Sequence, residues 1–266
     1  MAATGRGRNR TSAGIRFRVI GEGEPVLLLH GLMVTGAMFD PLVELLRGEF
    51  RMLVPDLRGH GAGGDLPGPY DVPGLAADMP AIIAEAGFER VAVLGYSHGG
   101  AVAQQLAHQR PDLVSRLMLA CTYAFNVATV RERIEASVLM AMLALFAPAS
   151  IGKLVFRASK TRTGGPVGLT ADQARSLRDE MAANRSGPMR AAARGLVTFD
   201  SRPWLGEIRT PTVVIGGALD TAVPRHHFDT LLGGIPGAVG RLVEGAGHTL
   251  IWTHTRELAA IVRENR

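Results

Sequence analysis

Short apolar runs alternate along this chain with longer stretches of helical periodicity. A run in which almost every residue is apolar is typical of a strand that is covered on both faces in a parallel sheet. A different run, residues 15–20, has apolar residues at every second position and predicts an exposed edge strand. We predict further strands at residues 25–29, 51–55, 91–94, 113–121, 211–217 and 240–244, those of residues 25–29 and 211–217 being buried.

Helical periodicity fills most of the gaps between these strands. Such alternation predicts an α/β fold with a mostly parallel central sheet flanked by helices. From residue 122 to residue 202 helices follow one another without a strand, which predicts a helical cap, or lid, inserted into a core of residues 15–121 and 203–266. Helices are predicted at residues 36–47, 71–87, 98–110, 130–146, 151–158, 171–184, 188–197, 225–232 and 251–264.

Composition narrows the class of protein. With 266 residues, of which 47% are hydrophobic and 20% charged, the chain can bury one large core. Much of the formal charge of +5 comes from Arg6, Arg8 and Arg10, in a Gly-rich segment of residues 1–14 that predicts a flexible tail. The remainder lacks the basic surface of a nucleic-acid-binding protein. Cys121 is the only cysteine, which excludes an internal disulfide.

No segment has the pattern of a targeting or membrane sequence. Residues 1–14 are polar and basic and lack the apolar run of a secretory signal. The most apolar stretch, residues 138–148, is about half as long as a membrane-spanning helix. We therefore expect a cytoplasmic protein without a membrane span.

One motif joins a predicted strand to a predicted helix, Gly95-Tyr96-Ser97-His98-Gly99-Gly100. A turn this sharp requires small residues on both sides of the serine and strained backbone torsions at the serine itself. It would hold the hydroxyl above the N-terminus of the following helix, where amide N–H groups favour developing negative charge. We interpret Ser97 as a nucleophile; a loop serine that caps the helix is the plain alternative.

A serine nucleophile needs a base, and His248 is the best candidate. It follows the strand of residues 240–244 in a Gly-rich loop that can bend the imidazole over the edge of the sheet. Asp220 follows another buried strand and would orient the imidazole, although it could instead cap the turn before the next helix. Asp56 also ends a strand, but Arg58 offers it a local partner.

Acyl transfer also needs N–H donors aimed at the oxyanion. The amide of His98, directly after the serine, is one, and the amide of Leu32 in the loop after residues 25–29 is the second. The His30 side chain is interpreted either as a structural hydrogen-bonding group under this loop or as a substrate contact. Tyr96 and Tyr123 are further candidate substrate contacts.

Together these residues resemble the α/β-hydrolase fold family, in its branch of esterases, lactonases and cofactor-free haloperoxidases. The resemblance spans about residues 15–264 and includes the family's order of serine, then aspartate, then histidine. It implies that a lid follows the sixth strand and sets substrate choice. Ser97 stands where haloalkane dehalogenases and epoxide hydrolases have an aspartate, which disfavours their chemistry here.

We therefore predict a serine hydrolase that cleaves a carboxylic ester or lactone with a hydrophobic portion through an acyl-enzyme. The substrate would be a small hydrophobic ester-, lactone- or ketone-type molecule, and no cofactor or metal is implied. Hydrolysis of a thioester or a C–C bond, a non-hydrolytic biosynthetic reaction, and lipase action at a membrane surface stay open. So do a ligand-binding protein on the same fold and a homodimeric state.

Overall fold

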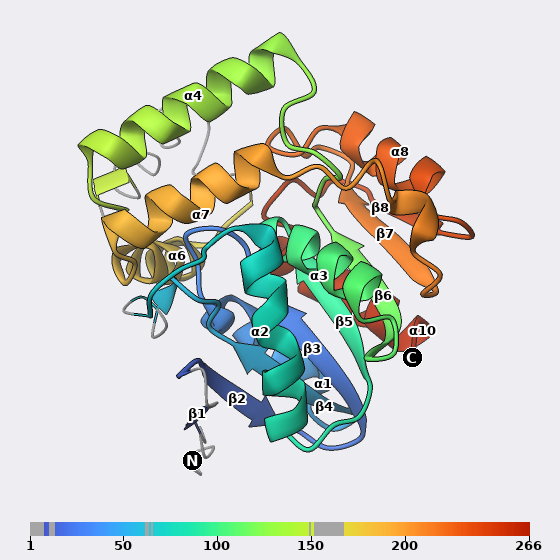
Figure 1. Cartoon of the computed structure of the whole chain (residues 1–266). Coiled ribbons are helices and arrows are strands. Elements are labelled where there is room, and N and C mark those ends of the chain that lie inside the picture. The colour runs from blue at the N-terminus through green and yellow to red at the C-terminus, as the bar shows by residue number, and fades with distance from the viewer. Residues whose placement is uncertain (1–7, 11–13, 62–63, 65, 149, 152–167) are drawn as a thin grey trace.

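The computed structural model describes residues 8–10, 14–61, 64, 66–148, 150–151 and 168–266. Their central element is an eight-stranded sheet with the order β1-β2-β4-β3-β5-β6-β7-β8 (Figure 1). β1 and β2 run antiparallel to their neighbours, and all other neighbouring strands are parallel. The strands are β1 (Arg8–Arg10), β2 (Arg16–Ile20), β3 (Glu24–Leu29), β4 (Phe50–Pro55), β5 (Val91–Tyr96), β6 (Val114–Ala120), β7 (Thr212–Gly217) and β8 (Val239–Val243).

The predicted strands are all confirmed, but β8 is a largely exposed edge strand, whereas the strand predicted at the edge is not there. β2 lies between β4 and the short strand β1, because Arg8–Arg10 pairs with Arg16–Arg18 in antiparallel register. Those three residues belong to the predicted tail. Its residues 1–7 and 11–13 lie outside the described part of the chain.

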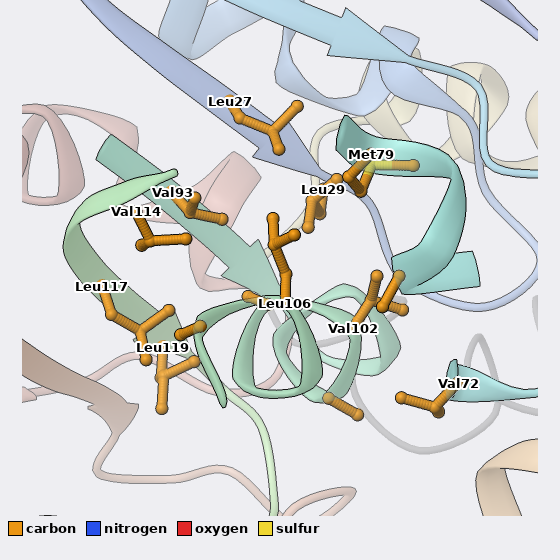
Figure 2. Packing of buried hydrophobic residues seen from close by; sticks show 14 of the residues in the cluster. Leu27, Leu29, Val72, Met79, Val93, Val102, Leu106, Val114, Leu117 and Leu119 are labelled. Atoms are coloured by element: carbon orange, nitrogen blue, oxygen red, sulfur yellow. The ribbon is translucent and has the colours of Figure 1, made fainter. Parts of the chain in front are cut away.

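Helices cover both faces of the sheet. On one face pack α2 (Val72–Glu85), α3 (His98–Gln109) and α8 (Arg225–Gly234), and Figure 2 shows Met79, Val102 and Leu106 of α2 and α3 against strand residues such as Leu29 and Leu119. The other face is covered by α1 (Asp40–Leu46), α9 (Leu250–Thr253) and α10 (Thr255–Glu264). Short 3-10 helices, η1 (Gly36–Phe39) and η3 (Leu205–Glu207), complete the core.

The predicted helix of residues 251–264 is divided into α9 and α10 at His254. His254 leaves the helical region, with φ −128° and ψ 40°. The hydroxyl of Thr255 donates to the carbonyl oxygens of Ile251, at 2.8 Å, and Trp252, at 3.2 Å. These bonds satisfy the carbonyl groups at the end of α9 and allow the chain to change direction.

Between β6 and β7 the described residues include the long helices α4 (Val130–Leu145), α6 (Ala171–Ala182) and α7 (Ser186–Thr198). They pack on one another through a small apolar cluster that also includes Met33, in the loop after β3. Figure 1 shows them as a separate layer beside the sheet. The predicted helix of residues 151–158 falls, beyond Ile151, outside the described residues.

None of the helices in the described part of the chain has both the length and the apolar character needed to cross a bilayer. The longest of these three helices, α4, carries four acidic or basic residues among its first six positions.

Two glycines allow α3 to pack directly against the strand ends. A Cβ atom at Gly95 would lie 2.5 Å from the carbonyl oxygen of Gly99 and 2.6 Å from the Cα atom of Gly100. At Gly99 it would collide with the carbonyl group of Leu29, at the end of β3. These neighbours are backbone atoms, which cannot move aside without shifting a strand or a helix.

Replacement of Gly99 by Ala is therefore expected to destabilise the fold by about 3 kcal/mol or more, because the added methyl group overlaps backbone. Urea unfolding followed by circular dichroism would measure this change. Gly187→Ala in α7 is the matched control, since no atom lies within 4 Å of its Cβ position. Equal stability of the two variants would contradict this account of the packing.

Candidate active site

Ser97 is held in a strained turn between β5 and α3. Its φ of 52° and ψ of −118° lie in a region that residues with a side chain rarely adopt, at a cost of about 1–3 kcal/mol. The amide of Ser97 donates to Ala120 at 2.9 Å, and its carbonyl oxygen accepts from the Thr122 hydroxyl at 2.6 Å. The turn is thus fixed by bonds to the end of β6, as the predicted strand-serine-helix motif requires.

His248 and Asp220 form a hydrogen-bonded pair. The two residues follow β8 and β7, and Nδ1 of His248 lies 2.9 Å from Oδ2 of Asp220. The Asp220 side chain is only 2% exposed, and its Oδ1 accepts from the amides of Ala222 and Val223, each at 2.9 Å. Because a carboxylate accepts hydrogen bonds, Nδ1 carries the proton and Nε2 of the neutral ring is the basic atom.

Tyr96 ties the histidine loop to the strand that carries the serine. Its hydroxyl donates to the carbonyl oxygen of His248, and the two ring centroids are 5.3 Å apart. Burial raises the pKa of the Tyr96 phenol well above its usual value, so the hydroxyl keeps its proton and remains a donor. Tyr96 also lines the cavity, as expected of a substrate contact, but its hydroxyl is engaged in positioning His248.

Ser97 and His248 face one cavity of about 580 Å³. Its walls come from the loop after β3, from the strand ends and from α4, α6 and α7, and most of the lining residues are apolar. The polar side chains of Asn126, Arg131, Glu132 and Glu135 line part of it near the start of α4. The apolar wall residues include Leu32, Met33, Val34, Tyr123, Ala136, Leu139, Leu177, Met181, Leu196, Val223 and Trp252.

The two predicted oxyanion donors occupy different elements around Ser97. Leu32 lines the cavity in the loop after β3, and His98 is the first residue of α3. A Cβ atom at Gly31 would lie 3.2 Å from the Tyr96 ring, so this loop runs close to the serine turn. The loop after β3 and the start of α3 therefore lie close together at Ser97.

His30 does not line the cavity. Its ring is fully buried, with Nδ1 2.8 Å from the carbonyl oxygen of Gly31 and Nε2 accepting from the amide of Leu57 at 2.9 Å. Burial lowers the pKa of His30 to about 4, so the ring is neutral and can accept that bond. Of the two interpretations offered by the sequence, this geometry supports the structural one and gives no support to a substrate contact.

Tyr123 lines the cavity while the His98 ring lies behind it. The side chain of Tyr123 is 1% exposed, and its hydroxyl is 3.5 Å from Nδ1 of His98. The His98 ring is fully buried, and burial lowers its pKa to about 3. Tyr123 is thus placed for the predicted substrate contact, whereas only the backbone of His98 adjoins Ser97.

Two polar residues at the end of α6, which the sequence pattern does not predict, hold the loop after β3. Asn184, just after α6, donates through Nδ2 to the carbonyl oxygen of Met33 at 2.8 Å and accepts from the amide of Gly61 at 3.0 Å. Glu180 accepts from the amide and the hydroxyl of Thr35, at 3.0 and 3.1 Å. On an amphipathic helix such residues have the pattern of a solvent-exposed face, so no local signal distinguishes them.

Comparisons with known proteins agree with this architecture. A family model described as alpha/beta hydrolase fold matches residues 24–255. An uncharacterized protein of Mycobacterium tuberculosis is 29% identical over 261 residues, covering 90% of this chain and 74% of that protein. A pimeloyl-acyl-carrier-protein methyl ester esterase of Aliivibrio salmonicida is 29% identical over 246 residues, covering 89% and 90% of the two chains. The solved structure of a hydrolase from Pseudomonas aeruginosa PA01 matches with a TM-score of 0.81 and 27% identity, covering 99% of this chain and 98% of that one.

Glu180 makes the stability of the fold depend on pH. Burial raises its pKa from 4.5 to about 7, partly offset by the bonds from Thr35. A carboxyl group whose pKa is higher in the folded than in the unfolded state contributes fully to stability when the pH is below the unfolded-state pKa. This contribution is lost as the pH rises through the folded-state pKa of about 7.

Glu180→Gln should abolish this dependence, because the amide cannot ionise and can still accept from Thr35. Between pH 5 and pH 8 we expect the free energy of unfolding of the unmodified protein to fall by about 2 kcal/mol relative to the variant. Denaturant titrations of both proteins at the two pH values measure this difference. The exposed substitution Glu135→Gln is the control, and parallel pH profiles for all three proteins would contradict the assignment.

Proposed function

This chain belongs to the α/β-hydrolase fold family and is a hydrolase. We propose that it cleaves a carboxylic ester or lactone with a hydrophobic portion. One observation carries the proposal. A serine with a strained backbone and a histidine bonded to a buried aspartate lie on the wall of the same apolar cavity. Strain that is maintained by so many surrounding contacts is characteristic of a reacting residue.

In the proposed reaction, Oγ of Ser97 attacks the carbonyl carbon while Nε2 of His248 takes the hydroxyl proton. Asp220 keeps the imidazole in the required tautomer and stabilises the imidazolium ion that forms. The amides of Leu32 and His98 donate to the oxyanion of the tetrahedral intermediate. The imidazolium then protonates the departing alkoxide, and Ser97 remains as the acyl ester.

Water completes the cycle. His248 removes a proton from the water as it attacks the acyl carbon, and the second tetrahedral intermediate collapses to release the carboxylic acid and Ser97. Each proton that His248 accepts is returned in the following step, so no further acid or base is required. Asp220 receives two amide hydrogen bonds throughout, which keep its carboxylate oriented toward the ring.

The cavity supports a substrate with an apolar portion. We propose that residues 122–202 act as the lid, since α4, α6 and α7 supply Leu139, Leu177, Met181 and Leu196 to its wall. Apolar surface of this kind favours burial of an acyl chain or a hydrophobic alcohol. The methyl ester esterase among the relatives agrees with ester chemistry, although its acyl-carrier substrate is named for that protein alone.

Ser97→Ala should lower turnover of p-nitrophenyl esters by about 10³-fold or more, because the nucleophile is lost while the turn is preserved. The same substitution should abolish labelling by a fluorophosphonate probe. Ser137→Ala, on the exposed side of α4, is the matched control and should retain both activity and labelling. Turnover close to that of the unmodified protein in Ser97→Ala would remove the proposal.

The acyl preference tests the cavity separately. Longer unbranched acyl groups should raise kcat/KM until the apolar wall is filled, because each buried methylene contributes about 0.8 kcal/mol. Leu139→Asp should reduce this gain more than it reduces acetate turnover, because it places a charge on the apolar wall that α4 supplies. Equal chain-length profiles for the two proteins would show that the lid does not contact the acyl group.

A further inference from the structure

Three side chains with metal-binding atoms converge beside the cavity, on elements far apart in sequence. Glu132 belongs to the first turn of α4, and His226 and His227 belong to the first turn of α8. Oε1 of Glu132 lies 2.9 Å from Nε2 of each histidine, and the three donor atoms all lie within 4.8 Å of one another.

The spacing of these atoms suits a transition-metal ion. Metal–ligand bonds of about 2.1 Å at right angles place neighbouring donor atoms about 3.0 Å apart. The two nitrogen–oxygen distances of 2.9 Å therefore fit two edges of a five- or six-coordinate ion with little movement. Two imidazoles and one carboxylate are a donor set used by zinc, nickel, cobalt and iron.

Hydrogen bonding alone does not account for the cluster. His227 forms a hydrogen bond to Oε1 of Glu132, whereas Nε2 of His226 is buried and has no hydrogen-bond partner despite its short distance to the same oxygen. A buried nitrogen without a partner is costly in a folded protein. A metal ion between the three atoms would satisfy it.

The remaining oxygen of Glu132 is already held. Oε2 accepts from the amides of Ala128 and Thr129, at 2.7 and 2.8 Å, as part of the cap of α4. These bonds fix the carboxylate so that Oε1 points to the histidines. Orientation of a ligand by hydrogen bonds to its far side is a regular feature of metal sites.

The nearby arginines are each paired with a carboxylate outside the cluster. Arg131 is paired with Glu135 at 2.7 Å, and Arg225 with Asp229 at 2.8 Å, so each guanidinium is directed to its own carboxylate.

We propose that Glu132, His226 and His227 bind one divalent transition-metal ion, with water in its remaining positions. The ion would join the start of the lid helix α4 to the core helix α8 and so hold the lid over the cavity. Of the three ligands Glu132 also lines the cavity, whereas neither histidine does, so the role proposed for the ion is structural.

The described residues contain a second group of possible metal ligands, Cys121, Asp220 and His248, which suits a metal ion less well. Asp220 and His248 are hydrogen-bonded to each other there. Burial raises the pKa of the Cys121 thiol well above its usual value, so it is protonated and a poor ligand.

The test is a titration of the tag-free, chelator-treated full-length protein with Co²⁺, followed by its visible absorption bands, and with Zn²⁺, followed by equilibrium dialysis. We expect one ion per chain, and a Kd raised at least tenfold by His226→Gln and by His227→Gln. His108→Gln, which changes a histidine on the surface of α3, is the matched control and should bind as the unmodified protein does. His248→Gln should also retain binding.

Added Zn²⁺ should in addition raise the Tm of the unmodified protein and of His108→Gln but not of the two site variants. The side chain of His226 is 40% exposed, so His226→Gln is expected to fold even where the buried His227→Gln does not. Absence of binding at millimolar metal, or binding that survives His226→Gln and is lost in His248→Gln, would overturn the proposal.

Discussion

The architecture depends on the contact between the first turn of α3 and the ends of β3 and β5. Backbone meets backbone there, because Gly95 and Gly99 leave no space for a side chain. This approach forces the chain through a positive φ at Ser97, and bonds from the end of β6 hold it in that conformation. The strain is sustained because the surrounding sheet is parallel, rigid and buried on both faces.

Loops from several strand ends are fixed around that turn by long-range polar contacts. Tyr96 binds the backbone of His248, His30 joins the loops after β3 and β4, and Asn184 joins those same two loops from the end of α6. In each of these bonds a side chain pairs with a backbone N–H or C=O group of a loop. The layer of α4, α6 and α7 is therefore hydrogen-bonded to the loops of the core beside the cavity.

Three buried imidazoles lie beneath the loops around Ser97, and none of them lines the cavity. The rings of His30, His60 and His98 are fully buried; the centroids of His30 and His60 lie 5.0 Å apart, and those of His60 and His98 lie 6.5 Å apart. Burial lowers their pKa values to about 4, 3 and 3, so the three rings are uncharged near neutral pH. Ser97, which directly precedes His98, therefore has uncharged rings behind its turn.

The sequence by itself determined the alternation of strands and helices, the sharp turn at Ser97 and the strand-end positions of Asp220 and His248. These features are encoded within a few residues, as apolar periodicity and turn chemistry. Only the tertiary structure decided which distant polar groups meet. Thr35 and Glu180 are 145 residues apart, Tyr96 and His248 are 152 apart, and Glu132 and His227 are 95 apart. The local sequence pattern does not predict such pairs, because a polar residue that will be buried has the same sequence signal as one that will be exposed. Only the packing of distant segments decides which of them is removed from water and needs a partner.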